Sequence, residues 1–152
     1  MIIKLGKSKS IALLKNNYIG HLAYVFNDQP HVLPITYYYD DITNSIIGYS
    51  GIGHKIKAMR INNAVSLEVS EVDSVNNWRS VVAYGTYREF VGSTAKISLH
   101  KFSDGVKDII KRKEGKDLKF LSEFSGKIYK EGLPIVFKID IAELTGRERQ
   151  FI

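Results

Sequence analysis

Alternating apolar and polar positions along the first third of the chain predict β-strands. Residues 21–26 and 31–39 are strand-like runs, and residues 27–30, Asn-Asp-Gln-Pro, have the chemistry of a hairpin turn between them. Residues 40–45 form a second turn, which leads into a short apolar run at residues 46–49. This pattern predicts three consecutive antiparallel strands.

Three further strand candidates follow later in the chain. Residues 64–69 alternate apolar with polar positions, as in a half-buried strand. Residues 78–90 are the longest candidate, with Gly85 where a bulge or a barrel bend is expected. Residues 133–141 form the last candidate. Two stretches without this alternation are expected to be a polar loop and a polar tail, namely residues 70–77 and 144–152.

Apolar positions spaced three and four residues apart predict helices between these strands. Ser8 to Ser10 are expected to cap a short helix that ends near Asn16, and residues 54–60 form an amphipathic helix after the third strand. The longest helix follows the fifth strand, with Ser93 or Thr94 as its cap.

Two glycines shape this longest helix. Gly105 is expected to weaken it by about 1 kcal/mol relative to alanine, and Gly115 is expected to end it. Residues 116–124 predict another short helix. Five or six strands joined mostly by short turns, with helices at their ends, predict a closed or nearly closed antiparallel barrel. A parallel nucleotide-binding fold is disfavoured because no G-x-G-x-x-G follows a strand.

Composition narrows the classes of protein that fit this pattern. A length of 152 residues predicts one domain, residues 1–152. The absence of cysteine excludes disulfides, thiolate metal sites and cysteine nucleophiles, and the 4 histidines lack metal-ligand spacing, so no metal site is expected. No apolar window approaches the ~20 residues of a membrane span. We therefore expect a cytoplasmic protein that does not enter the membrane.

The net charge of +6 favours an anionic partner without identifying it. Much of the excess lies between Lys107 and Lys119. A solvated helix face is the simpler account of this cluster, and a nucleic-acid-binding surface is the alternative.

Residues 46–60 combine glycines and cations in a way that fits an anion site. Gly51 and Gly53 let the backbone approach a ligand closely, and Ser50 offers a hydroxyl group. The N–H groups at the start of the following helix favour phosphate. The alternative is that the glycines only shape a strand-to-helix turn and that the cations are a solvated face.

Four motifs, taken in order, resemble the pyridoxamine 5'-phosphate oxidase-like superfamily of FMN-binding proteins, and especially its nitroimidazole-resistance flavoprotein branch. The motifs are Gly20 to Ala23, Pro30 to Tyr37, Tyr49-Ser50 with Gly53-His54-Lys55, and Trp78 to Val82 leading to Gly85. The resemblance covers residues 10–147. It implies a mainly β fold with helices: a six-stranded antiparallel split β-barrel of Greek-key type, with helices packed at its ends.

The resemblance also implies where FMN would bind. Part of the second strand would lie along the isoalloxazine ring, partly through backbone groups; these residues are Leu33, Pro34, Ile35, Thr36 and Tyr37. Tyr49 and Ser50 would flank the ribityl chain or the phosphate, and Lys55 would contact the phosphate. His54 is a further candidate beside Lys55, although an exposed residue at a helix start is the simpler account.

Members of this superfamily are usually homodimers with two flavins at the subunit interface. Ser80 falls where relatives place a polar side chain against the flavin, and Trp78 or Arg79 is expected to act on the partner's cofactor. Many nitroimidazole-type relatives have a histidine where this chain has Tyr49. With Tyr49 at this position, the resemblance still implies flavin binding, but it does not imply the nitro-reducing role.

The resulting hypothesis is an FMN-dependent oxidoreductase. It would pass electrons from a nicotinamide nucleotide through FMN to a small acceptor, of which a nitro compound is one candidate. The lack of an identifiable acid, base or nucleophile keeps a non-enzymatic flavin- or haem-binding protein as the alternative. A nucleic-acid-binding β-barrel is the least favoured hypothesis.

Overall fold

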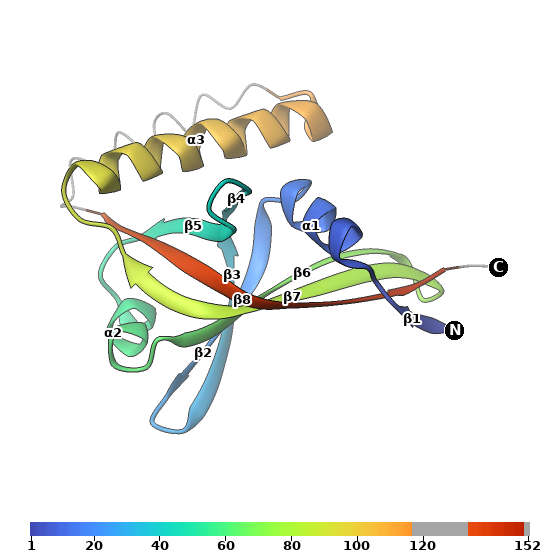
Figure 1. The fold of residues 1–152 in the computed structure, drawn as a ribbon, viewed down its shortest axis with the longest axis horizontal. Helices are drawn as coiled ribbons and strands as arrows, with labels where there is room; N and C mark the ends of the chain where they lie inside the picture. Colours follow the sequence, from blue (N-terminus) through green and yellow to red (C-terminus); the bar gives the residue numbers. More distant parts are fainter. Residues whose placement is uncertain (117–133, 151–152) are drawn as a thin grey trace.

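The computed structural model describes residues 1–116 and 134–150, and this part of the chain holds eight strands and three helices (Figure 1). The strands are β1 (Ile2–Lys4), β2 (Ile19–Phe26), β3 (Gln29–Thr36), β4 (Tyr38–Asp40), β5 (Ser45–Ser50), β6 (Ala64–Ser74), β7 (Asn77–Glu89) and β8 (Ile135–Arg149). The helices are α1 (Lys7–Lys15), α2 (His54–Ile61) and α3 (Ser93–Glu114). The predicted fold class, mainly β with helices, is confirmed.

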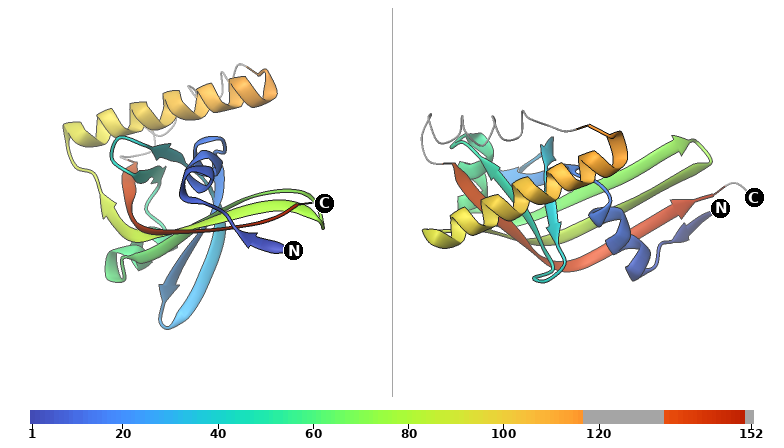
Figure 2. Two further views of the ribbon diagram at one scale, coloured as in Figure 1. Left: turned by 45° about the vertical axis from the view of Figure 1, so that its right-hand side comes forward. Right: turned by 90° about the horizontal axis from the view of Figure 1, so that it is seen from above.

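All eight strands belong to one antiparallel sheet. Its main path runs β3-β2-β6-β7-β8-β5-β4, and β1 pairs with β8. The sheet is strongly curved, with α3 lying along one side of it and α1 and α2 apart from each other (Figures 1 and 2). The sheet has eight strands rather than the predicted six. Within the described residues its two end strands, β3 and β4, do not pair with each other, so the sheet is not closed.

The second predicted strand is two strands. Residues 31–39 divide at Tyr37 into β3, which pairs with β2, and β4, which pairs with β5. Tyr37 is fully buried, and its hydroxyl donates to the carbonyl oxygen of Leu14 at 2.8 Å. The predicted antiparallel pairings are present, because β3 pairs with β2 and β4 pairs with β5. The division of the middle strand was not predicted, and it places the two pairs at opposite ends of the sheet path.

Two stretches predicted as a loop and a tail are strands. β6 and β7 form a long hairpin, and β8 continues through most of the predicted tail. Glu148 is buried whereas its neighbour Arg147 is exposed, so the polar composition of the tail hides a two-faced strand. The irregularity predicted at Gly85 is confirmed, since the β7–β8 register shifts between Tyr84 and Gly85.

All three described helices lie where the sequence predicts them. α3 ends at Gly115, which has a left-handed φ of 64°, as expected for a C-terminal glycine. The predicted serine and threonine caps are wrong, because Gly6 and Gly92 occupy the N-cap positions of α1 and α3. The helix predicted at residues 116–124 lies outside the described residues from position 117 onward.

Two clusters of buried side chains join these elements. The larger packs α1 and α2 against the inside of the curved sheet, and Leu14 and Ile56 are among its fully buried members. The smaller joins α3 to β5 and β8, with Phe102 and Val136 among its members. None of the helices in the described chain has the length and apolar character needed to cross a membrane.

Candidate functional site

The N-terminus of α2 leaves backbone N–H groups available. Gly53 is the N-cap, has an extended conformation and has no side chain that could cap the helix. The Lys57 N–H donates to the Gly53 carbonyl at 3.1 Å, so the N–H groups before it lie in the first turn, where helices lack internal partners. A Cβ atom added at Gly51 or Gly53 would meet nothing within 4 Å, so packing does not require either glycine. The approach to this terminus is open.

Lys55 adds a partly desolvated cation to this terminus. It is half-buried, and burial lowers the pKa of its ammonium group. Among the described residues, no carboxylate lies within 4.0 Å of its Nζ. Arg60 on the same helix is different, because it forms an ion pair with Glu89 at 2.8 Å. A partly buried cation without a partner carries a desolvation cost that an anionic ligand would offset.

His54 lies in a cluster of rings beside Lys55. The Tyr24 hydroxyl and His54 Nδ1 are 2.9 Å apart. His31 stacks on Tyr24 with ring centroids 5.1 Å apart and an interplanar angle of 11°, and its centroid lies 5.0 Å from that of His54. Phe26 contacts His54 edge-on at 5.1 Å. Sequence reasoning did not predict that Tyr24 and His31 lie beside His54. The two residues are partners in the β2–β3 register, and α2 reaches them only through tertiary packing.

Tyr49 and Ser50 end β5 just before this corner. Tyr49 packs edge-on against Phe102 of α3, with ring centroids 5.0 Å apart, and burial raises the pKa of its hydroxyl to about 12. The Ser50 hydroxyl donates to the Gly51 carbonyl at 2.8 Å. Neighbouring strand residues point to opposite faces. Tyr49 thus faces α3, and Ser50 is the member of the pair directed away from that helix.

The strand predicted to lie along a flavin ring is an edge of the sheet. Leu33 and Ile35 are partly buried and pack against the main core, whereas Pro34 and Thr36 are exposed on the opposite face. The side chain of Tyr37 lies in the core, as described above. Because β3 ends the path of the described sheet, the backbone groups along its outer edge have no strand partner there.

Trp78 and Ser80 lie at the other end of the molecule. Both are at the start of β7, whereas the end of β7 approaches α2 through a 2.9 Å bond from the Tyr87 N–H to the Asn63 carbonyl. At a rise of ~3.3 Å per residue, this separation along β7 is on the order of 30 Å. Within one chain, Trp78 and Ser80 are therefore separated from the segment that carries Ser50, His54 and Lys55.

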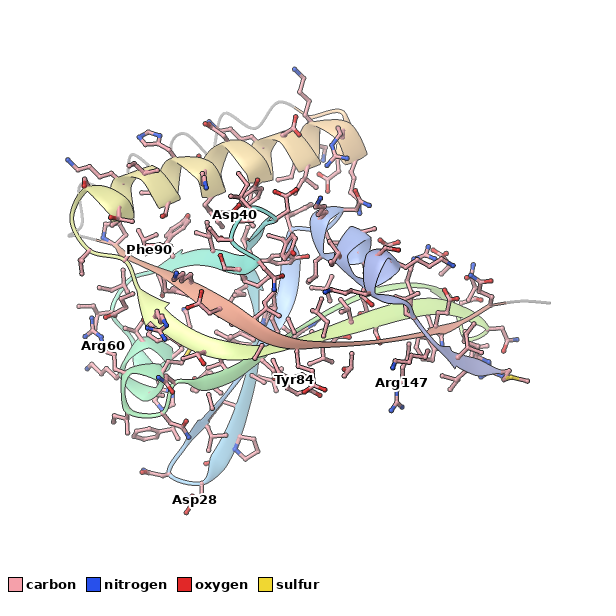
Figure 3. The ribbon with its side chains drawn as sticks, viewed as in Figure 1. Asp28, Asp40, Arg60, Tyr84, Phe90 and Arg147 are labelled. Atoms are coloured by element: carbon pink, nitrogen blue, oxygen red, sulfur yellow. The ribbon has the colours of Figure 1, made fainter. Side chains whose placement is uncertain are left out.

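The outer face of the sheet is the face turned away from α1 and α3 (Figure 3). One row of register partners crosses it from β3 to β8, comprising Val32, Ala23, Ser66, Tyr84 and Glu143. A shallow hollow of about 420 Å³ lies along this row. Val32 is 66% exposed and Tyr84 is 44% exposed, so apolar surface reaches solvent there. Figure 3 shows Tyr84 and Arg147 on the side of the sheet away from α1 and α3.

Some of the charged side chains elsewhere in the described residues form ion pairs or hydrogen bonds. Within residues 1–116 and 134–150, no group of three or more His, Asp or Glu side chains could hold a metal ion. Part of the basic cluster on α3 is engaged, since Lys113 donates to the Asn17 side chain at 3.0 Å and Arg112 lies 3.7 Å from Asp108. These contacts agree with a solvated helix face.

Comparisons with known proteins concern the family and the fold of this chain. The profile of the family described as Pyridoxamine 5'-phosphate oxidase matches residues 7–148. An uncharacterized protein of Rhizobium meliloti, RA0666, is 41% identical over 71 residues, which are 47% of this chain and 46% of that protein. The chain thus aligns with less than half the length of that relative.

Solved structures share the fold over nearly the whole chain. A FAD-binding protein from Mesorhizobium loti is 26% identical, with a TM-score of 0.75 and 99% of both chains covered. A candidate 5-nitroimidazole antibiotic resistance protein from Bacteroides thetaiotaomicron is 18% identical, with a TM-score of 0.66, 97% of this chain and 87% of that chain covered. The FAD and heme binding protein of Mycobacterium smegmatis is 12% identical, with a TM-score of 0.71 and coverage of 96% and 72%.

Proposed function

Because this chain belongs to the pyridoxamine 5'-phosphate oxidase family, we propose that it is a homodimeric flavoprotein that binds FMN at the start of α2 and acts as an oxidoreductase. FMN, when bound, can accept a hydride from a nicotinamide nucleotide and pass electrons to a small acceptor. The residues of this chain would bind the flavin, orient it and shield it from water. A cytoplasmic location remains part of the proposal.

The observation that carries the proposal is the candidate anion site at the start of α2, formed by Lys55 and the first backbone N–H groups of the helix, which we call the anion corner. Lys55 is a half-buried cation without a carboxylate partner among the described residues, and it adjoins helix N–H groups that no side chain of Gly53 can cap. A phosphate dianion satisfies both, because it accepts hydrogen bonds from the backbone and compensates the ammonium charge. The open space over Gly51 and Gly53 admits such a group.

The edge strand β3 supports a place for the flavin ring. Leu33 and Ile35 offer apolar surface, and the free backbone edge offers donors and acceptors for the polar rim of the isoalloxazine. Tyr37 would act indirectly, since its side chain belongs to the core.

A homodimer would reconcile the separated candidates. Trp78 and Ser80 are too far from Lys55 to share a flavin within one chain, but they lie at one end of the outer sheet face. If two copies pack through that face, the start of β7 from one copy can reach the anion corner of its partner. The partly apolar row around Tyr84 supports such a contact.

The cofactor test uses the purified 152-residue chain. We expect the fluorescence of FMN to be quenched when it binds to the protein. We also expect the cofactor extracted from the purified protein to be FMN. FAD and riboflavin are titrated in parallel, because the relative from Mesorhizobium loti is a FAD-binding protein. A colourless protein that binds none of the three flavins would contradict the proposal.

Turnover separates an enzyme from a flavin-binding protein. We expect the FMN-loaded protein to consume NADH or NADPH steadily when small acceptors, including nitro compounds, are supplied. Flavin binding without consumption in any of these mixtures would favour a non-enzymatic role. A Soret band after haem addition, lost when one histidine is replaced, would favour the haem-binding alternative.

A further inference from the structure

The pairing of Tyr24 with His54 has a direct effect on what His54 can donate. Tyr24 is only 6% exposed, whereas His54 is exposed at the first position of α2. Their contact uses the Nδ1 atom of the imidazole, 2.9 Å from the tyrosine hydroxyl. The ring nitrogen left over for a ligand is therefore Nε2.

We propose that Tyr24 is a positioning residue that holds His54 with its Nε2–H directed outward as a hydrogen-bond donor to the flavin phosphate. The inference rests on the proposed function, because the phosphate is the group that this donor would bind. It adds a residue from β2 to a site otherwise built from α2 and the end of β5.

The hydroxyl group of Tyr24 can serve both charge states of His54. A phenol is a donor as well as an acceptor, so it can donate to Nδ1 of a neutral imidazole and can accept from Nδ1–H of an imidazolium; we assign the first arrangement to the neutral ring. In the neutral ring a donor to Nδ1 fixes the proton on Nε2, and in the imidazolium both nitrogens carry protons. Nε2 is thus a donor to an anion in either state.

The surrounding rings restrict both partners. His31 stacks nearly parallel on Tyr24, with an interplanar angle of 11°, and Phe26 meets His54 edge-on at 80°. Burial of Tyr24 and these contacts limit rotation of the two side chains, so the hydrogen bond has a defined direction before any ligand arrives. A donor held in place loses less conformational entropy when it binds.

The experiment compares FMN with riboflavin, which lacks the phosphate. We expect His54→Ala to weaken FMN binding roughly ten- to hundredfold, as for loss of a charge-assisted hydrogen bond, and to leave riboflavin binding unchanged. We expect Tyr24→Phe, which keeps the ring, to weaken FMN binding roughly three- to tenfold because His54 is then no longer oriented. His54→Gln should restore part of the loss, since its amide can donate from a similar position. In the His54→Gln background, Tyr24→Phe should cause no further loss of FMN affinity.

Two further measurements keep a structural disturbance apart from the proposed role. Tyr39→Phe is the matched control, because it also removes a tyrosine hydroxyl, which donates to the Asn44 side chain at 2.8 Å. This hydroxyl does not contact α2, so we expect FMN binding to be unchanged. Long-range proton–nitrogen NMR spectra of the ligand-free protein, assigned with His54→Gln, should show His54 as the Nε2–H tautomer, and Tyr24→Phe should shift that signature.

The outcomes separate this inference from the function on which it rests. Failure of the wild-type protein to bind any flavin overturns both. Tight FMN binding that is unchanged in His54→Ala, an Nδ1–H tautomer in the wild-type protein, or equal losses for FMN and riboflavin in Tyr24→Phe overturns the inference alone.

Discussion

The helical pattern of residues 54–60 does not distinguish the three cations of α2, but the structure does. Lys55 is half-buried and has no carboxylate within ion-pair distance among the described residues. Arg60 is neutralised by Glu89, and Lys57 is exposed. Amphipathic spacing predicts the helix and its charge but not which cation is desolvated, because desolvation depends on packing against other elements. At the scale of single residues, Lys55 is therefore the first candidate for phosphate.

Replacing Lys55 tests this assignment. We expect Lys55→Ala to weaken FMN binding roughly ten- to hundredfold, because a charge-assisted hydrogen bond contributes about 1.5–3 kcal/mol. The midpoint of urea unfolding should hardly change, since no ion pair of the described structure is lost. Lys57→Ala is the matched control and should bind FMN like the wild-type protein. Equal affinity in Lys55→Ala would remove this lysine from the site.

At the scale of elements, the longest helix depends on a glycine that weakens it. Gly105 lies inside α3, where glycine is unfavourable for helix formation. A Cβ atom at this position would overlap the ring of Tyr38 in β4. The glycine thus permits close contact between α3 and the sheet. Helical periodicity finds α3 but gives no information about this approach, which involves residues far apart in the chain.

Adding a methyl group at this contact should destabilise the protein. We expect Gly105→Ala to lower the free energy of unfolding by roughly 1–3 kcal/mol through overpacking, although alanine favours helix formation. In a Tyr38→Ala background the same change should instead stabilise by about 1 kcal/mol, because the overlap is gone and the helix preference remains. Urea unfolding curves measure both. Stabilisation by Gly105→Ala in the wild-type background would show that this contact is not tight.

At the scale of the whole molecule, the outer sheet face is the surface through which we propose that two copies meet. It carries exposed apolar side chains at Val32 and Tyr84 and a shallow hollow to whose lining Tyr84 contributes. The register that aligns these residues arises only when β3, β2, β6 and β7 pair. The same face carries Ser80 and Trp78, which the proposed flavin site requires from a partner.

A charge placed on this face should separate the copies. We expect Tyr84→Glu to raise the dimer dissociation constant by roughly a hundredfold, as for loss of a central aromatic contact, with a parallel loss of FMN affinity. Ile42→Glu is the control, because Ile42 is 83% exposed in the turn between β4 and β5. Sedimentation velocity measures both. A monomeric wild-type protein, or a dimer that Tyr84→Glu leaves intact, would contradict the proposed interface.

The sequence by itself determined the local elements of this protein. Periods of two and of three to four residues are set by backbone geometry, so they located β2, β6, β7 and the three helices, and Gly115 marked the end of α3. The ordered motifs also indicated the family. Polar composition misled at residues 144–149, because a strand with one exposed face and few apolar residues resembles a tail.

Only the tertiary structure decided which elements became neighbours. Local pattern cannot specify that residues 31–39 divide at Tyr37, because the division occurs at a buried residue whose hydroxyl is bonded to Leu14 in α1. It cannot pair Tyr24 with His54, 30 residues apart, or separate Trp78 from Lys55. The anion corner at residues 46–60 was visible as glycines and cations. The burial that singles out Lys55 and the hydrogen bond that orients His54 depend on packing between distant segments.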